Sequence, residues 1–188
     1  MTYHVVTYTG PFGFIKPWTA VRDGETFSQP FLTPSIVEGM REKLGVSEIL
    51  RHRLAHGGIS KQQEAIQSAG FKKNTRARTL SRGTGILTRG VMLDPVLHLA
   101  FPSAEDAARA AKQHLCLCRN EDLVYPAGEP RELSEAAFDG LEGFELRFAD
   151  AEAPGSFLVG YNRFADGAPM YGRLEVVGNP ATAEPLDL

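Results

Sequence analysis

A strand followed by a well-capped helix opens this chain, and that pair restricts the fold more than any other feature. Residues 3–9 (YHVVTYT) are rich in β-branched and aromatic side chains and end at a Gly-Pro step, which is typical of a strand. Residues 34–44 begin with a proline that follows Thr33, carry apolar side chains on one helical face and are followed by Gly45. Proline at the first helical position and glycine behind the last one are common boundaries of a helix.

The same order returns further along the chain. Residues 91–101 (VMLDPVLHLAF) predict a strand in which Pro95 marks a bulge or an edge. Residues 103–115 predict a second helix with Ser103 as its N-cap. With one further strand between 46 and 54 and short strands after the second helix, the order becomes βαββαβ. We therefore predict an α+β fold with a ferredoxin-like, RRM-like core and a β-rich extension in the last third of the chain.

Positive charge gathers in the middle of the chain. The whole chain has a formal net charge of −3, but residues 49–93 contain nine Lys or Arg against one Glu. Residues 72–82 (KKNTRARTLSR) contain five basic residues and no acidic one. A concentrated run of one sign is typical of a segment that binds a polyanion. The alternatives are a solvated loop and a docking surface for an acidic protein. A short helix at 59–71 and a hairpin or mobile loop at 71–90 are the local expectations.

Several classes of protein lack their sequence signatures here. No apolar run is long enough to span a membrane, and we see no secretory signal, so we expect a cytoplasmic protein. Phosphate-loop, nucleophile-elbow and dinucleotide motifs are absent from the sequence. Cys116 and Cys118 are too few for a structural zinc site, and we expect them to be small apolar residues of a core strand. We expect no cofactor and no metal.

Three stretches together resemble the fifth CRISPR-associated (Cas) protein family, of the RAMP superfamily. They are residues 10–45 (GPFGFIKPWTAVRDGETFSQPFLTPSIVEGMREKLG), 78–101 (RTLSRGTGILTRGVMLDPVLHLAF) and 115–126 (LCLCRNEDLVYP). The positions that match the family's helix start and its later acidic run are Pro30, Thr33, Pro34, Ser35, Gly39, Arg119, Glu121, Asp122, Leu123 and Val124. Cys118 stands where the family usually has glycine.

The resemblance implies a subunit of a Cascade-like CRISPR surveillance complex that caps the 5′ handle of the guide RNA (crRNA). Residues 1–125 would then form an RRM-like RNA-binding domain with a basic thumb inserted at about 49–90. Residues 126–188 would form a C-terminal β-rich extension packed on it. The implied partners are the crRNA, the large subunit and a backbone subunit of the same complex, and indirectly the target DNA.

The candidate RNA-binding residues come from the loop before the first helix, the helix start and the basic run. Helix N-termini offer backbone N–H groups to phosphate, aromatic rings stack on bases, and Lys and Arg neutralise phosphate. The candidates are Phe14, Lys16, Trp18, Arg22, Thr33, Ser35, Lys72, Lys73, Asn74, Arg76, Arg78, Arg82 and Arg119. The aromatic residues of the loop have an alternative role, which is to pack it onto the core.

A second function remains open at this point. One branch of the resembled family cleaves precursor crRNA without metal, and such a reaction needs a general base and a proton donor. His52 and His56, with Lys61 beside them, are the candidates for this metal-independent endoribonuclease. However, that branch's tyrosine would fall near residues 27–29, where this chain has Phe-Ser-Gln. We therefore predict a non-catalytic subunit.

Overall fold

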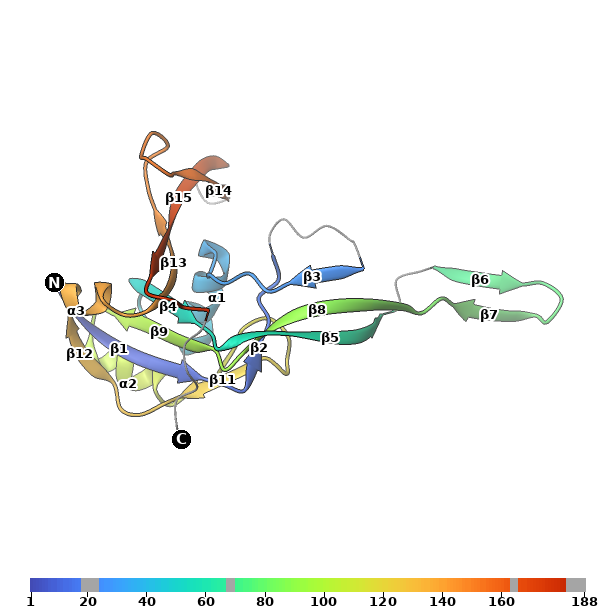
Figure 1. Cartoon of the computed structure of the whole chain (residues 1–188), viewed down its shortest axis with the longest axis horizontal. Coiled ribbons are helices and arrows are strands. Elements are labelled where there is room, and N and C mark those ends of the chain that lie inside the picture. The colour runs from blue at the N-terminus through green and yellow to red at the C-terminus, as the bar shows by residue number, and fades with distance from the viewer. Residues whose placement is uncertain (18–23, 67–69, 163–165, 182–188) are drawn as a thin grey trace.

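The computed structural model describes residues 1–17, 24–66, 70–162 and 166–181. One large antiparallel sheet forms its centre (Figure 1). Its strands run in the order β10 (Leu115–Cys116), β11 (Leu123–Pro126), β1 (Thr2–Thr9), β9 (Val96–Phe101), β4 (Arg51–Ala55), β13 (Gly143–Phe148), β15 (Ala168–Val177) and β14 (Phe157–Asn162), and β12 (Arg131–Ser134) also pairs with β1.

The α+β prediction is confirmed. Along the chain β1, α1 (Pro34–Leu44), β4, β9, α2 (Ala104–Ala110) and β11 follow one another as strand, helix, strand, strand, helix and strand. In the sheet the four strands lie in the order β11, β1, β9, β4, and every neighbouring pair is antiparallel. The strand expected between 46 and 54 is β4, and the last third of the chain is rich in strands.

The helices cover the two faces of this sheet. Met40 and Leu44 of α1 and Ala107 of α2 are buried against the side that carries Val6 and Leu99. The hydroxyl of Tyr8 donates to the Ala110 carbonyl oxygen at 2.9 Å and ties α2 to β1. On the other face Phe138 of α3 (Glu135–Asp139) packs against Tyr3, Val5 and Ala100. Side chains of β1 therefore belong to two separate apolar clusters on opposite faces of the sheet, because successive side chains of a strand point to opposite faces.

A long antiparallel arm leaves the central sheet after β4. β5 (Gly58–Ile66) pairs with β8 (Gly85–Leu93) over nine residue pairs, and β2 (Phe12–Gly13) and β3 (Glu25–Phe27) also pair with β8. At its far end β6 (Phe71–Asn74) and β7 (Thr79–Arg82) form a two-stranded ribbon. Figure 1 shows β5 and β8 extending away from the body, with β6 and β7 outermost. We call residues 71–82 the basic ribbon.

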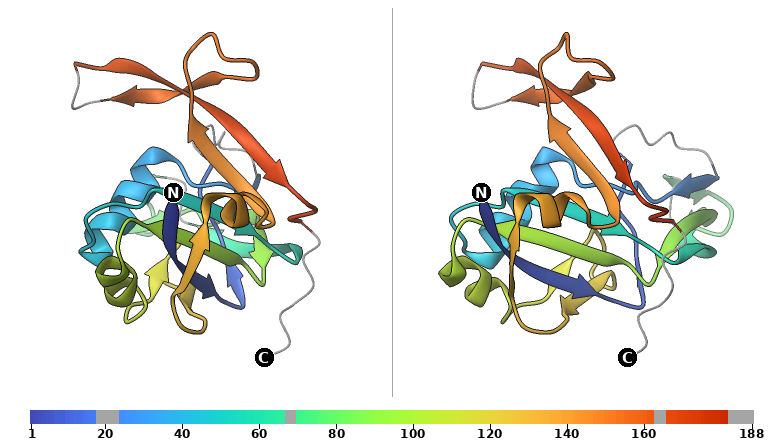
Figure 2. Two further views of the ribbon diagram at one scale, coloured as in Figure 1. Left: turned by 90° about the vertical axis from the view of Figure 1, so that its left-hand side faces the viewer. Right: turned by 60° about the vertical axis from the view of Figure 1, so that its left-hand side comes forward.

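The last strands form a second projection. β13, β15 and β14 pair as one antiparallel unit, and β13 touches the central sheet through the pair Phe144–Leu54. In both views of Figure 2 these strands rise away from the rest of the sheet. We call β13, β14 and β15 the C-terminal arm.

Three local predictions were wrong. Residues 59–66 of the helix expected at 59–71 belong to strand β5, because pairing with β8 supplies hydrogen bonds that no local pattern reveals, and residues 67–69 lie outside the described part of the chain. The strand expected at 91–101 is two strands, since Asp94 adopts a positive φ of 47° and turns the chain between β8 and β9. Cys116 and Cys118 are exposed, because the alternation of β10 turns Leu115 and Leu117 into the core instead.

Candidate nucleic-acid interface

The basic ribbon presents two different faces to solvent. Directly opposed residues of an antiparallel pair lie on the same face. The pairs Phe71–Arg82 and Lys73–Leu80 give one face an aromatic ring, an aliphatic side chain and two cations. The pairs Lys72–Ser81 and Asn74–Thr79 make the other face polar. Phe71 and Leu80 are each 69% exposed, so this face presents two large apolar side chains to solvent.

A tight turn holds the remaining cations at the tip. The Asn74 side-chain oxygen accepts hydrogen bonds from the backbone N–H groups of Arg76 and Ala77, at 3.2 and 3.1 Å. Asparagine is favoured in turns for this local bond. Arg78 adopts a positive φ of 52°. Asn74, predicted as a direct RNA ligand, therefore has a structural role in the turn that displays Arg76 and Arg78.

Four of the five cations of the basic ribbon have no acidic partner within the described residues. Lys72, Lys73, Arg76 and Arg78 are exposed and have no carboxylate within ion-pair distance in that part of the chain. Arg82 is exposed too, and its guanidinium lies 5.6 Å from the centre of the Phe71 ring. A compact group of cations without acidic partners repels itself, and this repulsion is relieved when an anion binds.

Phe14 and Arg119 lie where the arm formed by β5 and β8 joins the core, and they hold this arm in place. Phe14 is 1% exposed, and the guanidinium carbons of Arg89 and Arg119 lie 5.1 and 5.5 Å from its ring centre. Arg89 is paired with Glu64 on the neighbouring strand. Arg119 makes a bidentate contact with the fully buried Asp122, which raises the pKa of Arg119. Both residues were proposed to contact RNA, but their contacts here fix the position of β8 against the core.

The start of α1 has the predicted geometry. Thr33 is the N-cap, Pro34 occupies the first turn, and Gly45 ends the helix with a φ of 65°. The Thr33 hydroxyl contacts the Ser35 hydroxyl at 3.1 Å and makes no side-chain cap bond to the helix backbone. Lys16 and Ser35 are exposed, whereas Thr33 is buried. Trp18 and Arg22 lie outside the described residues.

The candidate nuclease residues are not arranged as a surface site. His52 in β4 is 4% exposed, and its Nε2 accepts a hydrogen bond from the Leu146 N–H at 3.4 Å. Burial, followed by the charges of Arg53 and Arg51, lowers the pKa of His52 to about 3. His56 is 5% exposed, and burial lowers its pKa as well. Lys61 is exposed on β5 and pairs with Glu25. Both imidazoles are therefore neutral at pH 7 and shielded from a polynucleotide.

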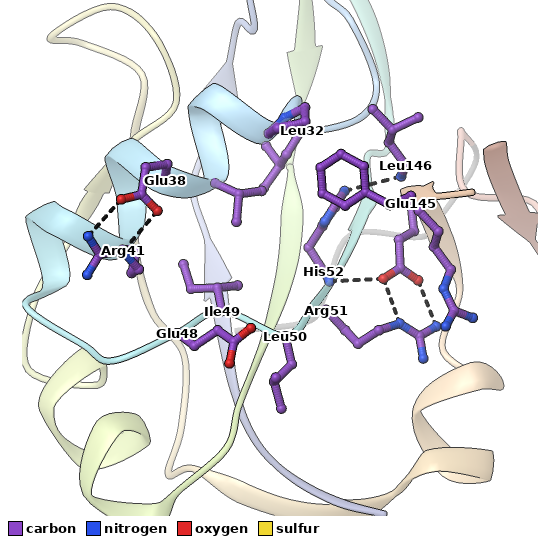
Figure 3. Close-up of a pocket in the computed structure, with 14 residues that line it drawn as sticks. Leu32, Glu38, Arg41, Glu48, Ile49, Leu50, Arg51, His52, Glu145 and Leu146 are labelled. Atoms are coloured by element: carbon purple, nitrogen blue, oxygen red, sulfur yellow. Dashed lines mark hydrogen bonds and ion pairs between the residues drawn. The ribbon is translucent and has the colours of Figure 1, made fainter. Parts of the chain in front are cut away.

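A pocket of about 430 Å³ lies beside α1 (Figure 3). Leu32 and Val37 line the helix side, Ile49 lines the floor, and Leu146 and Phe148 of the C-terminal arm line the opposite side. Arg51 and His52 form its polar edge. The Arg51 guanidinium and the His52 backbone N–H both donate hydrogen bonds to the Glu145 carboxylate, as Figure 3 shows. Glu38, Arg41 and Glu48 also line the pocket, so its surface is mixed polar and apolar.

The pocket borders a buried ion cluster that sequence reasoning missed. Arg51 donates to both oxygens of Glu145, at 2.7 and 2.8 Å, and to Asp139 at 2.9 Å. Arg53 lies 3.4 Å from Glu145 and 3.5 Å from Glu175. The Glu145 carboxylate also accepts a hydrogen bond from the His52 backbone N–H at 3.3 Å, so this side chain joins β13 to β4 beside their backbone pairing. The ion cluster therefore ties the C-terminal arm to the central sheet. Only the unusual density of arginines in 51–53 hinted at buried acidic partners.

Other kinds of site are not supported by the described residues. Among them no group of three or more His, Cys, Asp or Glu side chains is placed to hold a metal ion. No helix in this part of the chain is both long enough and apolar enough to cross a membrane.

Solved structures provide the match to known proteins. No protein-family model and no curated protein matches the sequence. Seven chains of solved structures match, and one belongs to a structure entitled "CRISPR RNA-guided surveillance complex". That chain is 15% identical in sequence, has a TM-score of 0.54, and aligns over 96% of this chain and 92% of its own length. The fold described above is therefore shared along almost the entire length of both chains.

Proposed function

We propose that this chain is a non-catalytic, RNA-binding subunit of a CRISPR effector complex, where it holds the 5′ handle of the crRNA. The fold supports this proposal, since the similar chain belongs to an RNA-guided complex and the alignment covers nearly all of both chains. The motifs that resemble the fifth Cas family point the same way. In this role the chain contacts the large subunit and a backbone subunit of its complex, and it serves antiviral defence.

The observation that carries the proposal is the basic ribbon. It holds five cations without an acidic residue, and it projects from the body on a long arm (Figure 1). An isolated two-stranded hairpin is marginally stable in water, so a ligand that covers both faces would also stabilise it. A single-stranded RNA is suited to both faces, because its phosphates pair with Lys and Arg and its bases stack on exposed aromatic rings.

The two faces then have separate roles. Lys72, with the hydroxyls of Thr79 and Ser81 on the same face, binds phosphate and ribose oxygens. Phe71 and Leu80, flanked by Lys73 and Arg82, form the face that contacts bases or the neighbouring subunit. Burial of His52 and His56 supports a role in holding the RNA and not in cutting it, since neither ring is placed to exchange a proton with a 2′-hydroxyl.

The proposal is tested by measuring the affinity of the purified chain for repeat-derived RNA over a series of salt concentrations, in EDTA. Five phosphate contacts give a slope of log K against log salt of about −3.5, at roughly 0.7 per contact on single strands. Replacing Lys72, Lys73, Arg76 and Arg78 with glutamine removes four contacts, so the slope should weaken by about 2.8.

A matched pair of variants controls for net charge. Lys72→Gln with Lys73→Gln should reduce the slope by about 1.4, whereas Lys43→Gln with Lys112→Gln removes two exposed cations elsewhere and should leave it unchanged. Equal effects of the two double variants would reject the assignment of the interface. RNA cleavage in EDTA that is lost in His52→Ala or His56→Ala would favour the nuclease, and the absence of salt-sensitive RNA binding, both by the chain alone and in the assembled complex, would favour docking of an acidic protein.

A further inference from the structure

A half-exposed aromatic ring lies on the arm formed by β5 and β8, between the body and the basic ribbon. Phe27 of β3 is 45% exposed. β3 pairs in parallel with β8, so Phe27 stands opposite Gly90, and Lys61 of β5 stands opposite the same glycine from the other side. Figure 1 shows β3 beside β8, on the part of the arm that leads toward β6 and β7. The three residues therefore form one row across three strands.

Glycine at position 90 gives the ring its place. A Cβ added there would lie 2.1 Å from one carbon of the Phe27 ring and 2.8 and 2.9 Å from two others. Only glycine leaves room for such a close approach, so the ring lies across the β8 backbone at this position. The Lys61 ammonium lies 5.4 Å from the ring centre. The ring is thus held against β8 and keeps a large part of its surface exposed.

A row of polar side chains lies next to the ring. Glu25 of β3 stands opposite Thr88 of β8, and Gln63 of β5 stands opposite the same threonine from the other side. These residues and Lys61 line an open hollow on the arm. The Lys61 ammonium pairs with the Glu25 carboxylate at 2.6 Å, and the two side chains remain 62% and 44% exposed. The hollow therefore offers a carboxylate, an amide and a hydroxyl beside an aromatic ring.

This combination has the chemistry of a site for one nucleobase. RNA-binding proteins stack unpaired bases on aromatic rings and read the edges of these bases through hydrogen bonds. A carboxylate only accepts hydrogen bonds, so it favours a base with an exocyclic amino group and disfavours the carbonyl oxygen that uracil has in the same place. The Glu25 carboxylate keeps lone pairs for such a bond, because its contact with one ammonium group does not use all of them.

We propose that the hollow beside Phe27 binds one unstacked RNA base that carries an exocyclic amino group. The base stacks on the exposed part of the Phe27 ring, its amino group donates to the Glu25 carboxylate, and Lys61 neutralises a phosphate of the same strand. This inference rests on the proposed function, since the base belongs to the RNA that the basic ribbon holds. Phosphate contacts and stacking are largely independent of sequence, so the hollow supplies a base preference that the basic ribbon lacks.

The test compares the affinities of the purified chain for oligocytidine and oligouridine of equal length, about eight nucleotides. The two oligomers carry the same phosphates, but cytosine has an amino group where uracil has an oxygen. The wild type should bind oligocytidine about tenfold more tightly, which is the magnitude of a hydrogen bond to a charged group. Glu25→Gln should bring this ratio to about one, because an amide donates as well as accepts. Glu105→Gln removes a carboxylate from an exposed ion pair of α2 and should keep the ratio.

Substitutions of the ring test stacking separately. Phe27→Leu should weaken oligocytidine binding about fivefold or more, and Phe27→Tyr should retain it, because only tyrosine keeps an aromatic ring. Phe148→Leu is the matched control, since Phe148 is 66% exposed and lies on the C-terminal arm. Equal effects of the two leucine variants would contradict the site. In the native assembly a photo-cross-linking residue in place of Phe27 should attach to RNA, and attachment to protein alone would overturn the proposal.

The base site and the basic ribbon fail in different ways. The salt dependence of affinity measures the phosphate contacts of the basic ribbon, whereas the ratio between the two oligomers measures the hollow. Equal affinities with a steep salt dependence would overturn the base site and leave the role of the basic ribbon intact. A ratio that persists while glutamine substitutions in the basic ribbon leave the salt dependence unchanged would reject the basic ribbon and keep the base site. Absence of binding to either oligomer would overturn both.

Discussion

The buried imidazole of His52 makes a sharp prediction about stability and pH. This ring lies between Arg51 and Arg53 in β4, and it stays neutral in the folded chain because burial and both arginines lower its pKa to about 3. In the unfolded chain a histidine has a pKa of about 6.5. Below that value the unfolded state binds a proton that the folded state does not bind. The stability that depends on a neutral His52 is therefore present above pH 6.5 and is lost as the pH falls toward 3.

The magnitude follows from these two pKa values. Between pH 7 and pH 5, protonation of one such histidine in the unfolded state lowers the free energy of unfolding by about 2 kcal/mol. His98 contributes a similar loss in the wild type, since burial and Arg131 lower its pKa to about 4. The buried ion cluster acts mainly at lower pH, because the neighbouring arginines hold the pKa values of Asp139 and Glu175 below their usual range.

The perturbation is His52→Gln, which keeps an acceptor for the Leu146 N–H and removes the titrating group. Urea unfolding at pH 7, 6 and 5, followed by circular dichroism, should show that the variant loses about 2 kcal/mol less than the wild type over this range. His114→Gln replaces an exposed histidine and controls for the substitution itself. Parallel curves for wild type and His52→Gln would refute the reasoning, whatever the absolute stability of the variant.

Three further predictions concern the ion cluster, the first helix and the basic ribbon. Glu145→Gln should lower the free energy of unfolding by about 3 kcal/mol because it leaves the buried Arg51 without its main partner, whereas Glu38→Gln, in an exposed pair, should leave it nearly unchanged. Gly45→Ala should cost about 1 kcal/mol in the same urea assay, since alanine is strained at a φ of 65°. Phe71→Ala should weaken RNA binding by about 1–3 kcal/mol in an anisotropy titration if the ring stacks on a base, and Val176→Ala should leave it unchanged.

Features fixed by neighbouring residues were predicted correctly from the sequence. The first helix begins after Thr33 and ends at Gly45 because its boundary signals are local. The order of strands and helices in the core follows from hydrophobic periodicity and is found in the structure. The basic ribbon is a hairpin, one of the two forms that its sequence allowed.

Features that depend on distant contacts were missed. Residues 58–66 form a strand because β8 lies beside them, and their polar sequence gives no sign of that partner. Arg51 and Glu145 are 94 positions apart, so their buried pair has no sequence signal. For Phe14 the sequence left two roles open, stacking on a base and packing onto the core, and its burial between Arg89 and Arg119 fits the second role. Charge and aromaticity selected the candidate RNA-binding residues, whereas burial decides which of these candidates are accessible to a ligand.

Protein–RNA cross-linking of the native assembly tests the central claim most directly. Ultraviolet irradiation followed by mass spectrometry identifies the peptides that carry a nucleotide adduct. We predict adducts in residues 71–82, with Phe71 the most reactive position, and their loss when the four cations of the basic ribbon are replaced with glutamine. Adducts confined to other surfaces, with residues 71–82 unmodified and equally accessible to protease before and after RNA removal, would contradict the proposed function.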